Sequence, residues 1–169
     1  MLLINLNQQK CIILLHIQVP IIAMTHCEAA KVISKFGSAS DGFLCPTQWA
    51  ETLSYSDNLF GAASTYDMLF KGSFEGYKNV PYQSAQASAA VMVWKDAFER
   101  ANSHDTEKVR DAIASTNMAT FYGNIKFSSA GNNLAKPMVL RQIQNGKLNV
   151  VAPSKWASHP VDYPRSAKY

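Results

Sequence analysis

The spacing of hydrophobic residues predicts that strands and helices alternate in the first part of the chain. An apolar, β-branched run predicts a buried strand at residues 19–24. The apolar positions that follow recur at helical spacing, which predicts a helix that Thr25 caps and that ends before Gly37. A turn at Asp41-Gly42 and the run "FLCPTQW" then predict a second short strand. Two strands separated by a helix are typical of a parallel α/β sheet.

The central part of the chain is predicted to be helical. Amphipathic patterns predict helices at 58–74 and 82–101. Ala85 and Ala89 share one face of the second of these helices, and such small side chains permit close packing on a sheet. A third helix is predicted in "DTEKVRDAIA", where Asp105 is a good N-cap.

The last third of the chain is predicted to form β-structure. A short extended segment at 120–127 is followed by apolar runs at 138–144 and 148–152. These two runs flank Asn145-Gly146, which is the strongest short signal for a β-hairpin. The sequence therefore predicts an α/β fold, Rossmann-like or flavodoxin-like, with a partly parallel sheet, flanking helices and a C-terminal β-hairpin.

Composition and charge place the chain among ordinary globular proteins. It has 169 residues, of which 47% are hydrophobic and 17% charged, with a formal net charge of +4. The basic residues are scattered and do not alternate with aromatic ones, so no nucleic-acid partner is predicted. The glycines form neither GxGxxG nor a Walker pattern, and we expect no cofactor.

The three cysteines raise the question of thiol or metal chemistry. An odd number cannot all pair within one chain, and no CxxC motif supports a zinc site. A cysteine-dependent hydrolase would need a Cys-His pair and a third, orienting residue, which the sequence does not supply. The alternative is that the cysteines are buried and inert, and we expect neither an enzyme nor a metal site. The residues weighed for such a pair are Cys27 and Cys45 with His26, His104 or His159.

The amino-terminal segment is apolar but interrupted. His16, Gln18 and Pro20 break its hydrophobic run, which argues against both a transmembrane helix and a signal peptide. We expect residues 1–19 to be an irregular, non-native extension. The prolines and the absence of periodicity after residue 153 predict that 154–169 form a C-terminal tail.

The carboxy-terminal half resembles a known family. The runs "PYQSAQASAAVMVWKDAFERA" and "DTEKVRDAIASTNMATFYGNIKFSSAGNNLAKPMVLRQIQNGKLNVVAP" are similar to the C-terminal part of type I periplasmic (solute) binding proteins. These are the substrate-binding subunits of amino-acid and amide ABC transporters of the branched-chain type. The resemblance covers residues 22–164. Family members are about twice as long and have two α/β lobes, so the resemblance implies that 20–153 is the C-terminal lobe of a truncated protein whose N-terminal lobe is missing.

The resemblance also implies a function. Such proteins capture an amino acid of the branched-chain type, or a small amide, in the cleft between the lobes and present it to a membrane permease. They are periplasmic or extracellular and carry out no covalent chemistry. With half of the cleft wall missing, weak or no binding is expected. The alternative is a ligand-sensing or interaction module of a receptor or regulatory system with the same fold.

The first group of candidate ligand contacts follows the first predicted strand. The resemblance implies that Glu28 pairs with the α-ammonium of the ligand, since a charge-assisted hydrogen bond in a dry cleft is strong. The alternative is that Glu28 lies in the first turn of the helix and is stabilised by the helix dipole. Thr25 and Cys27 lie at the same strand end and would line the pocket, or serve only the structure.

The second group of candidates lies farther along the chain. Gln48 and Trp49 follow the second predicted strand and would face the cleft, although Trp49 would also suit a packing role in the hinge. Tyr82 and Gln83 begin the long helix, where unpaired backbone N–H groups face outward. Tyr122 is expected to pack rather than to reach the ligand.

Overall fold

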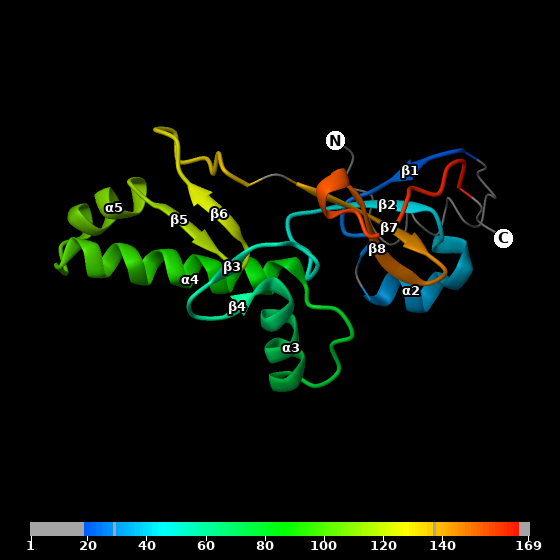
Figure 1. Cartoon of the computed structure of the whole chain (residues 1–169), viewed down its shortest axis with the longest axis horizontal. Helices are drawn as coiled ribbons and strands as arrows, with labels where there is room; N and C mark the ends of the chain where they lie inside the picture. The colour runs from blue at the N-terminus through cyan, green and yellow to red at the C-terminus, as the bar shows by residue number, and fades with distance from the viewer. Residues whose placement is uncertain (1–18, 29, 137, 166–169) are drawn as a thin grey trace. The chain divides into compact units, whose positions relative to one another are not determined.

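The computed structural model describes residues 19–28, 30–136 and 138–165 (Figure 1). Contacts divide the chain into two compact units. The first, called the sheet unit, comprises residues 1–52 and 138–169, and the second, called the helical unit, comprises residues 53–137. Both boundaries fall inside 20–153, the segment predicted to be one lobe.

The sheet unit is built around a mixed four-stranded sheet. Its strands are β1 (Ile22–Ala23), β2 (Phe43–Thr47), β7 (Val139–Gln144) and β8 (Lys147–Ala152), in the order β1-β2-β7-β8. β1 and β2 run parallel, whereas β7 is antiparallel to both β2 and β8. The predicted α/β fold with a partly parallel sheet, flanking helices and a C-terminal hairpin is therefore confirmed.

The connection between β1 and β2 contains less helix than predicted. Residues 25–28 form a turn in which His26 has a φ of 62°, a left-handed conformation that an α-helix does not accommodate. The helix α2 (Ala30–Phe36) begins after this turn and continues into the 3₁₀ helix η1 (Gly37–Ser40). The predicted cap at Thr25 is wrong, because the backbone is left-handed at His26 and α2 begins later.

The core of the sheet unit joins both parallel strands to α2. Its buried cluster includes Met24, Val32, Phe43 and Ile143. A disulfide between Cys27 and Cys45 lies within the same cluster and ties the turn after β1 to β2. Covalent and apolar contacts thus fix the turn that carries Glu28.

The β7–β8 hairpin turns at Asn145-Gly146, as predicted. Asn145 has a φ of 51° and Gly146 a φ of 71°. Two consecutive positive φ angles are what a type I′ turn requires, and asparagine and glycine tolerate them best. The register pairs Ile143 with Leu148 and Gln144 with Lys147.

The segment after β8 packs on the sheet unit. It contains the short 3₁₀ helix η2 (Ser154–Trp156), whose Trp156 side chain is buried. The buried Gln142 side chain accepts a hydrogen bond from the backbone N–H of Asp162 at 2.7 Å and donates one to its carbonyl at 3.0 Å. The N–H of Arg165 donates to the carbonyl of Pro20 at 3.0 Å. These contacts hold the tail against the sheet.

The helical unit contains the three predicted helices. They are α3 (Ala63–Ser73), α4 (Tyr82–Ala101) and α5 (Thr106–Ala114). The bounds predicted for α4 are confirmed. Asp105 caps α5 as predicted, because its side chain accepts from the backbone N–H groups of Glu107 and Lys108.

Two short β-ribbons complete the helical unit. The predicted helix at 58–74 begins too early, because β3 (Ser56–Asp57) and β4 (Gly61–Ala62) form an antiparallel pair there. The Asp57 carboxylate accepts hydrogen bonds from the backbone N–H groups of Leu59 and Phe60 and closes the turn. The segment predicted as extended from residue 120 is part of a ribbon of β5 (Asn117–Thr120) and β6 (Gly123–Lys126).

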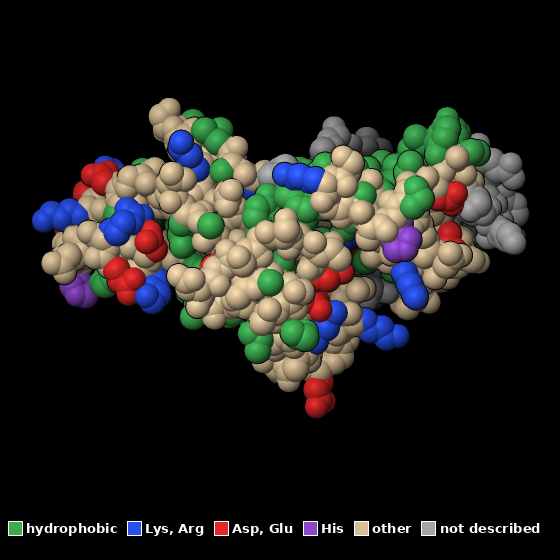
Figure 2. All heavy atoms as spheres, in the orientation of Figure 1, with side chains coloured by type: hydrophobic (Ala, Val, Ile, Leu, Met, Phe, Trp, Pro, Cys, Tyr) green, Lys and Arg blue, Asp and Glu red, His purple; other side chains and the backbone are tan. Residues whose placement is uncertain are grey.

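Surface properties agree with those of a globular chain. Figure 2 shows positive and negative side chains interspersed on the face it displays, with no large area of one sign. Among residues 19–28, 30–136 and 138–165, none of the helices has both the length and the apolar character needed to cross a membrane.

Candidate functional site

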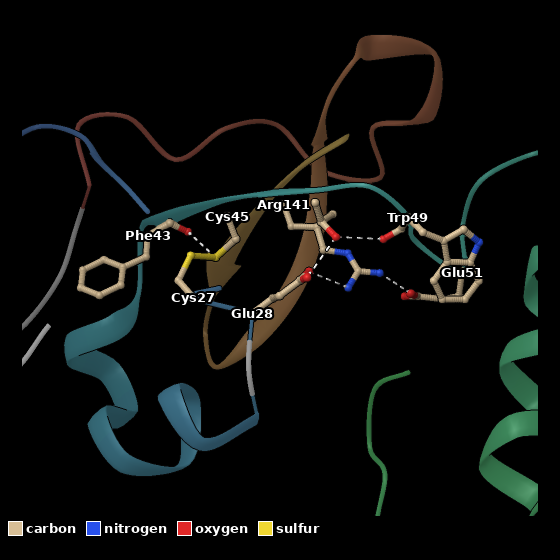
Figure 3. Close-up of polar contacts among 8 residues, drawn as sticks. Cys27, Glu28, Phe43, Cys45, Trp49, Glu51 and Arg141 are labelled. Atoms are coloured by element: carbon tan, nitrogen blue, oxygen red, sulfur yellow. Dashed lines mark hydrogen bonds and ion pairs between the residues drawn. A yellow bond between two sulfur atoms is a disulfide. The ribbon is translucent and has the colours of Figure 1, made fainter. Parts of the chain in front are cut away.

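A buried ion pair lies near the carboxyl end of β2. Glu28 follows β1, and Arg141 lies on β7 opposite Cys45 of β2. Nη1 of Arg141 is 3.4 Å from Oε2 of Glu28, and the two side chains are only 4% and 12% exposed. Figure 3 shows the Glu28 carboxylate directed toward the guanidinium group. Ligands of doubly wound sheets bind at this edge.

Two further residues contact the ion pair, and one of them adds a second negative charge. Oε2 of Glu51 lies only 2.5 Å from Nη2 of Arg141. Thr47, at the end of β2, donates its hydroxyl hydrogen to Oε1 of Glu28 at 3.0 Å. Two carboxylates therefore share one guanidinium, so the site carries an excess of one negative charge when both are ionised.

The environment of Glu28 shifts its proton affinity. Burial raises the pKa of Glu28 above its ordinary value, while the charge of Arg141 and the hydrogen bond from Thr47 oppose that rise. The dominance of burial means that the ion pair does not fully compensate for the loss of water around the carboxylate. A second positive group near Glu28 would stabilise its ionised form.

The raised pKa predicts a pH-dependent stability. The folded protein holds a proton on Glu28 more tightly than the unfolded chain does, so the contribution of this group to stability is full below about pH 4.3 and is lost as the pH rises through the raised pKa. We expect the wild-type free energy of unfolding, relative to Glu28→Gln, to decrease as the pH rises from about 4 through the raised pKa of Glu28. Urea unfolding at several pH values measures it. Glu75→Gln, which replaces an exposed glutamate, is the control, and the same pH trend in that comparison would contradict the assignment.

The structure decides against the alternative role for Glu28. α2 begins at Ala30, and its first turn contains no acidic residue. Glu28 therefore precedes the helix and contacts Arg141 and Thr47. The interpretation that it is a first-turn residue stabilised by the helix dipole is wrong. Its role as a ligand contact remains a prediction.

The two other candidates in this turn differ in what they offer. The hydroxyl of Thr25 is buried and has no hydrogen-bond partner among the residues that the structure describes. Cys27 is fully buried and bonded to Cys45, so neither sulfur carries a thiol. The hydrolase alternative through Cys27 or Cys45 loses its nucleophile, and the interpretation of these two as free buried cysteines is corrected to a disulfide.

Gln48 and Trp49 directly follow β2, as predicted. Gln48 is half-buried, while Trp49 has no exposed surface. The carbonyl of Trp49 lies 3.3 Å from the Thr47 hydroxyl, so its backbone borders the Glu28 site (Figure 3). Complete burial of the Trp49 ring agrees with the packing interpretation.

Tyr82 and Gln83 belong to the helical unit, at the start of α4. Tyr82 is half-buried and Gln83 exposed. Burial raises the pKa of the Tyr122 hydroxyl, and the nearby Tyr82 side chain adds to that rise. Nζ of Lys136 lies 3.5 Å from the centre of the Tyr122 ring, and burial lowers the pKa of Lys136 to about 7. Tyr122 is thus a packed residue, as expected.

The sheet unit also has an open hollow of about 720 Å³. It is lined by polar side chains from β7, β8 and the tail, among them Lys147, His159 and Asp162. None of the ligand contacts predicted from the sequence lines this hollow. Within the described part of the chain, no cluster of histidine, cysteine and acidic side chains could hold a metal ion.

Sequence reasoning missed three members of the site. They are Thr47, Glu51 and above all Arg141, which brings the acidic residues together. A signal was present in "MVLRQIQ", where a charged residue interrupts an apolar strand. A buried charge needs a counter-charge, so such an arginine predicts an acidic partner elsewhere in the chain.

Comparison with solved structures relates this geometry to known proteins. A leucine binding protein of Thermotoga maritima is 25% identical with a TM-score of 0.72, and the match covers 85% of this chain and 39% of the other. A protein of Silicibacter pomeroyi described as a branched-chain amino acid ABC transporter is 14% identical with a TM-score of 0.72, covering 94% and 44%. A branched-chain amino acid transporter substrate binding protein of Streptococcus pneumoniae, in complex with isoleucine, is 14% identical with a TM-score of 0.64, covering 79% and 37%.

The chain thus spans about two fifths of the length of these proteins. The sequence also matches the family of the periplasmic binding protein domain over residues 8–168, which is nearly its whole length. The mixed sheet, the disulfide-linked turn and the acidic site lie within that match. On this basis the chain belongs to the periplasmic binding protein domain family.

Proposed function

We propose that the chain contributes the ammonium-binding wall of a substrate-binding component of an ABC transporter, which captures a branched-chain amino acid or a small amide. The family and the leucine binding protein at 25% identity support this class of ligand. Binding and release would occur without covalent chemistry. A permease would receive the loaded protein, and a second lobe would supply the opposite wall of the cleft.

This proposal rests on the unequal distances from the Arg141 guanidinium to its two carboxylate partners. Its guanidinium lies against Glu51 at a short separation, whereas its nearest approach to Glu28 is 3.4 Å. Charge-assisted N–H···O bonds are normally about 2.7–2.9 Å long. Oε2 of Glu28 is therefore incompletely paired, and an ammonium group would complete it. The hydroxyl of Thr25, which has no hydrogen-bond partner within the described part of the chain, offers a second polar contact in the same turn.

A periplasmic or extracellular location is part of the proposal. The family is that of periplasmic proteins, and the Cys27–Cys45 disulfide suits an oxidising compartment. In a sensing system, which is the alternative, the same ligand contacts would serve a different receiving protein.

Ligand binding is expected to be weak for these 169 residues alone. Only part of a two-walled cleft is available, so little ligand surface would leave water. We expect leucine and isoleucine to bind with dissociation constants well above micromolar, and heteronuclear NMR titration of the 169-residue protein measures such affinities. Shifts are expected at the backbone amides of 25–28 and 47–49.

Ligand fragments and variants make the titration specific. Isoamylamine keeps the ammonium group and apolar chain of leucine, whereas 4-methylpentanoate keeps the chain and the carboxylate. We expect isoamylamine to shift the backbone amide signals of residues 25–28 and 4-methylpentanoate to leave them unchanged. Glu28→Gln should abolish the response, and the control Glu75→Gln should retain it. Equal responses to both fragments, or micromolar binding of leucine, would refute the proposal.

A further inference from the structure

The turn between β7 and β8 carries a chemically reactive pair of residues. Asn145 is followed by Gly146, and both are exposed at the end of the hairpin. In such a pair the backbone nitrogen of the glycine can attack Cγ of the asparagine, because a glycine has no side chain that hinders the approach. No other asparagine of the sequence precedes a glycine. The turn is therefore the place in the chain where this reaction meets least steric hindrance.

The reaction is a deamidation that needs only water. Attack forms a bond between the Gly146 nitrogen and Cγ of Asn145, and the bond from Cγ to the side-chain nitrogen breaks. The amide proton of Gly146 leaves with that nitrogen as ammonia, and a five-membered succinimide ring remains. Water then opens the ring at either carbonyl, which gives aspartate or isoaspartate at position 145. No oxidant or reductant takes part.

Water reaches the turn, but the conformation of the hairpin opposes ring closure. Asn145 and Lys147 line the open hollow of about 720 Å³. A flat ring requires Cβ of Asn145 and the Gly146 nitrogen to be nearly eclipsed about the Cα–C bond between them. A type I′ turn keeps these atoms apart, since ψ at its first central residue is about 30°. Deamidation therefore requires the turn to open.

Asp41 holds the turn in its closed conformation. Its Oδ1 accepts a hydrogen bond from the backbone N–H of Gly146 at 3.0 Å, although the two residues are 105 positions apart in the chain. The bonded nitrogen is the atom that must attack Asn145. The negative carboxylate also opposes the loss of a proton from this nitrogen, because two like charges would then lie side by side. The contact thus disfavours both steps that precede ring closure.

Backbone contacts fix Asp41 beside the hairpin. Its own N–H donates to the carbonyl of Ser38 at 3.1 Å, and the N–H of Gly42 donates to the carbonyl of Ile143 at 2.7 Å. The carbonyl of Gly42 accepts from the buried Gln142 side chain at 3.2 Å. The fold therefore places the Asp41 carboxylate at the turn through contacts on both sides of it.

We propose that Asn145 is a site of spontaneous deamidation and that Asp41 protects it by holding the Gly146 nitrogen in the closed turn. The rate of modification then follows how often the turn opens locally, so it is slow in the folded chain. The site is separate from the proposed ligand contacts, because Thr47 pairs with the first residue of β7 and the turn follows the last.

Either product alters the hairpin. Aspartate at position 145 adds a negative charge to a hollow that Asp41 and Asp162 already line. Isoaspartate adds one carbon to the main chain, which a two-residue turn between Gln144 and Lys147 does not accommodate. Modification would therefore weaken the end of the sheet where β7 and β8 meet.

Incubation of the full chain at neutral pH, below its melting temperature, tests the proposal. Trypsin releases the peptide 142–147, which contains Asn145 but not Asp41. Its gain in mass measures deamidation, and chromatography separates aspartate from isoaspartate. We expect the wild-type chain to deamidate severalfold more slowly than a free peptide of the same sequence. Asp41→Ala should react about tenfold faster than the wild type, which is the effect of losing a hydrogen bond to a charged group.

Two measurements separate protection of the turn from general stability. Asp162→Ala removes a carboxylate from the same hollow but keeps the contact between Asp41 and Gly146, so it should deamidate at the wild-type rate. In Asp41→Ala, hydrogen exchange of the Gly146 amide should accelerate together with deamidation, while exchange of the amides in β2 should stay slow.

Equal deamidation rates of Asp41→Ala and the wild type would overturn the proposal, and so would a wild-type rate equal to that of the free peptide. If Asp41→Ala does not fold, Asp41→Ser takes its place, because serine keeps a turn-forming hydroxyl but lacks the charge. It should also deamidate faster than the wild type, and an unchanged rate would again refute the role of Asp41. No ligand takes part, so the result is independent of amino-acid binding.

Discussion

Replacing Arg141 by methionine is expected to lower the free energy of unfolding by about 3–5 kcal/mol. The substitution keeps the volume roughly constant but leaves Glu28 buried without its counter-charge. It also removes the contact to Glu51, which is more exposed and can regain water. Most of the loss is therefore assigned to Glu28. Urea unfolding at pH 7, followed by far-ultraviolet circular dichroism, measures the difference.

A double variant and a surface arginine provide the controls. Adding Glu28→Gln to Arg141→Met removes the unpaired charge, so part of the lost stability should return. Arg110→Met is the matched surface change, because Arg110 pairs with Glu107 and Asp111 on the exposed surface. It should leave the unfolding midpoint unchanged within error. An equally small effect of Arg141→Met would contradict the importance of the buried pair.

Removal of the disulfide is expected to have the next largest effect. Cys27 and Cys45 are 18 positions apart, and cross-linking a loop of about this length stabilises a protein by about 3 kcal/mol through the unfolded state. The double variant Cys27→Ala, Cys45→Ala should lose a similar amount. Thermal and urea unfolding of the two proteins under oxidising conditions measure it.

Reducing agent supplies an independent comparison. Dithiothreitol should destabilise the wild-type protein and have no further effect on the double variant, which retains Cys11. A wild-type midpoint that does not respond to reduction would count against the disulfide. Loss of the disulfide should also weaken the NMR response to amino acids, because the bond fixes the turn between β1 and Glu28.

Elements with strong local signals were predictable from the sequence. The bounds of α4, the Asp105 cap and the Asn145-Gly146 turn depend on periodicity, side-chain hydrogen bonds and backbone preference within a few residues. The start of α2 and the β3–β4 ribbon were missed. In both places the backbone conformation overrides a pattern of apolar residues, through the positive φ of His26 and the bonds from the Asp57 carboxylate.

The candidate site was only partly predictable because it is assembled across the chain. Glu28 was selected by family resemblance, but Arg141 is 113 positions away and enters the site through strand register. No local sequence pattern predicts which strand lies next to β2. The Cys27–Cys45 bond was missed for a related reason, since an odd number of cysteines leaves their pairing open and only the parallel alignment of β1 and β2 brings these two together.

The sheet unit is formed by two segments of the chain that the helical unit separates, and this affects folding during synthesis. β2 can pair with β7 only after roughly 90 more residues have been synthesised. At about 5–20 residues per second, this takes about 5–20 seconds. During that interval Glu28 has no Arg141, and one edge of β2 lacks its neighbour. The whole helical unit emerges in the meantime. The nascent chain therefore exposes the unpaired edge of β2, with Glu28 beside it, until β7 has been synthesised and the sheet can close.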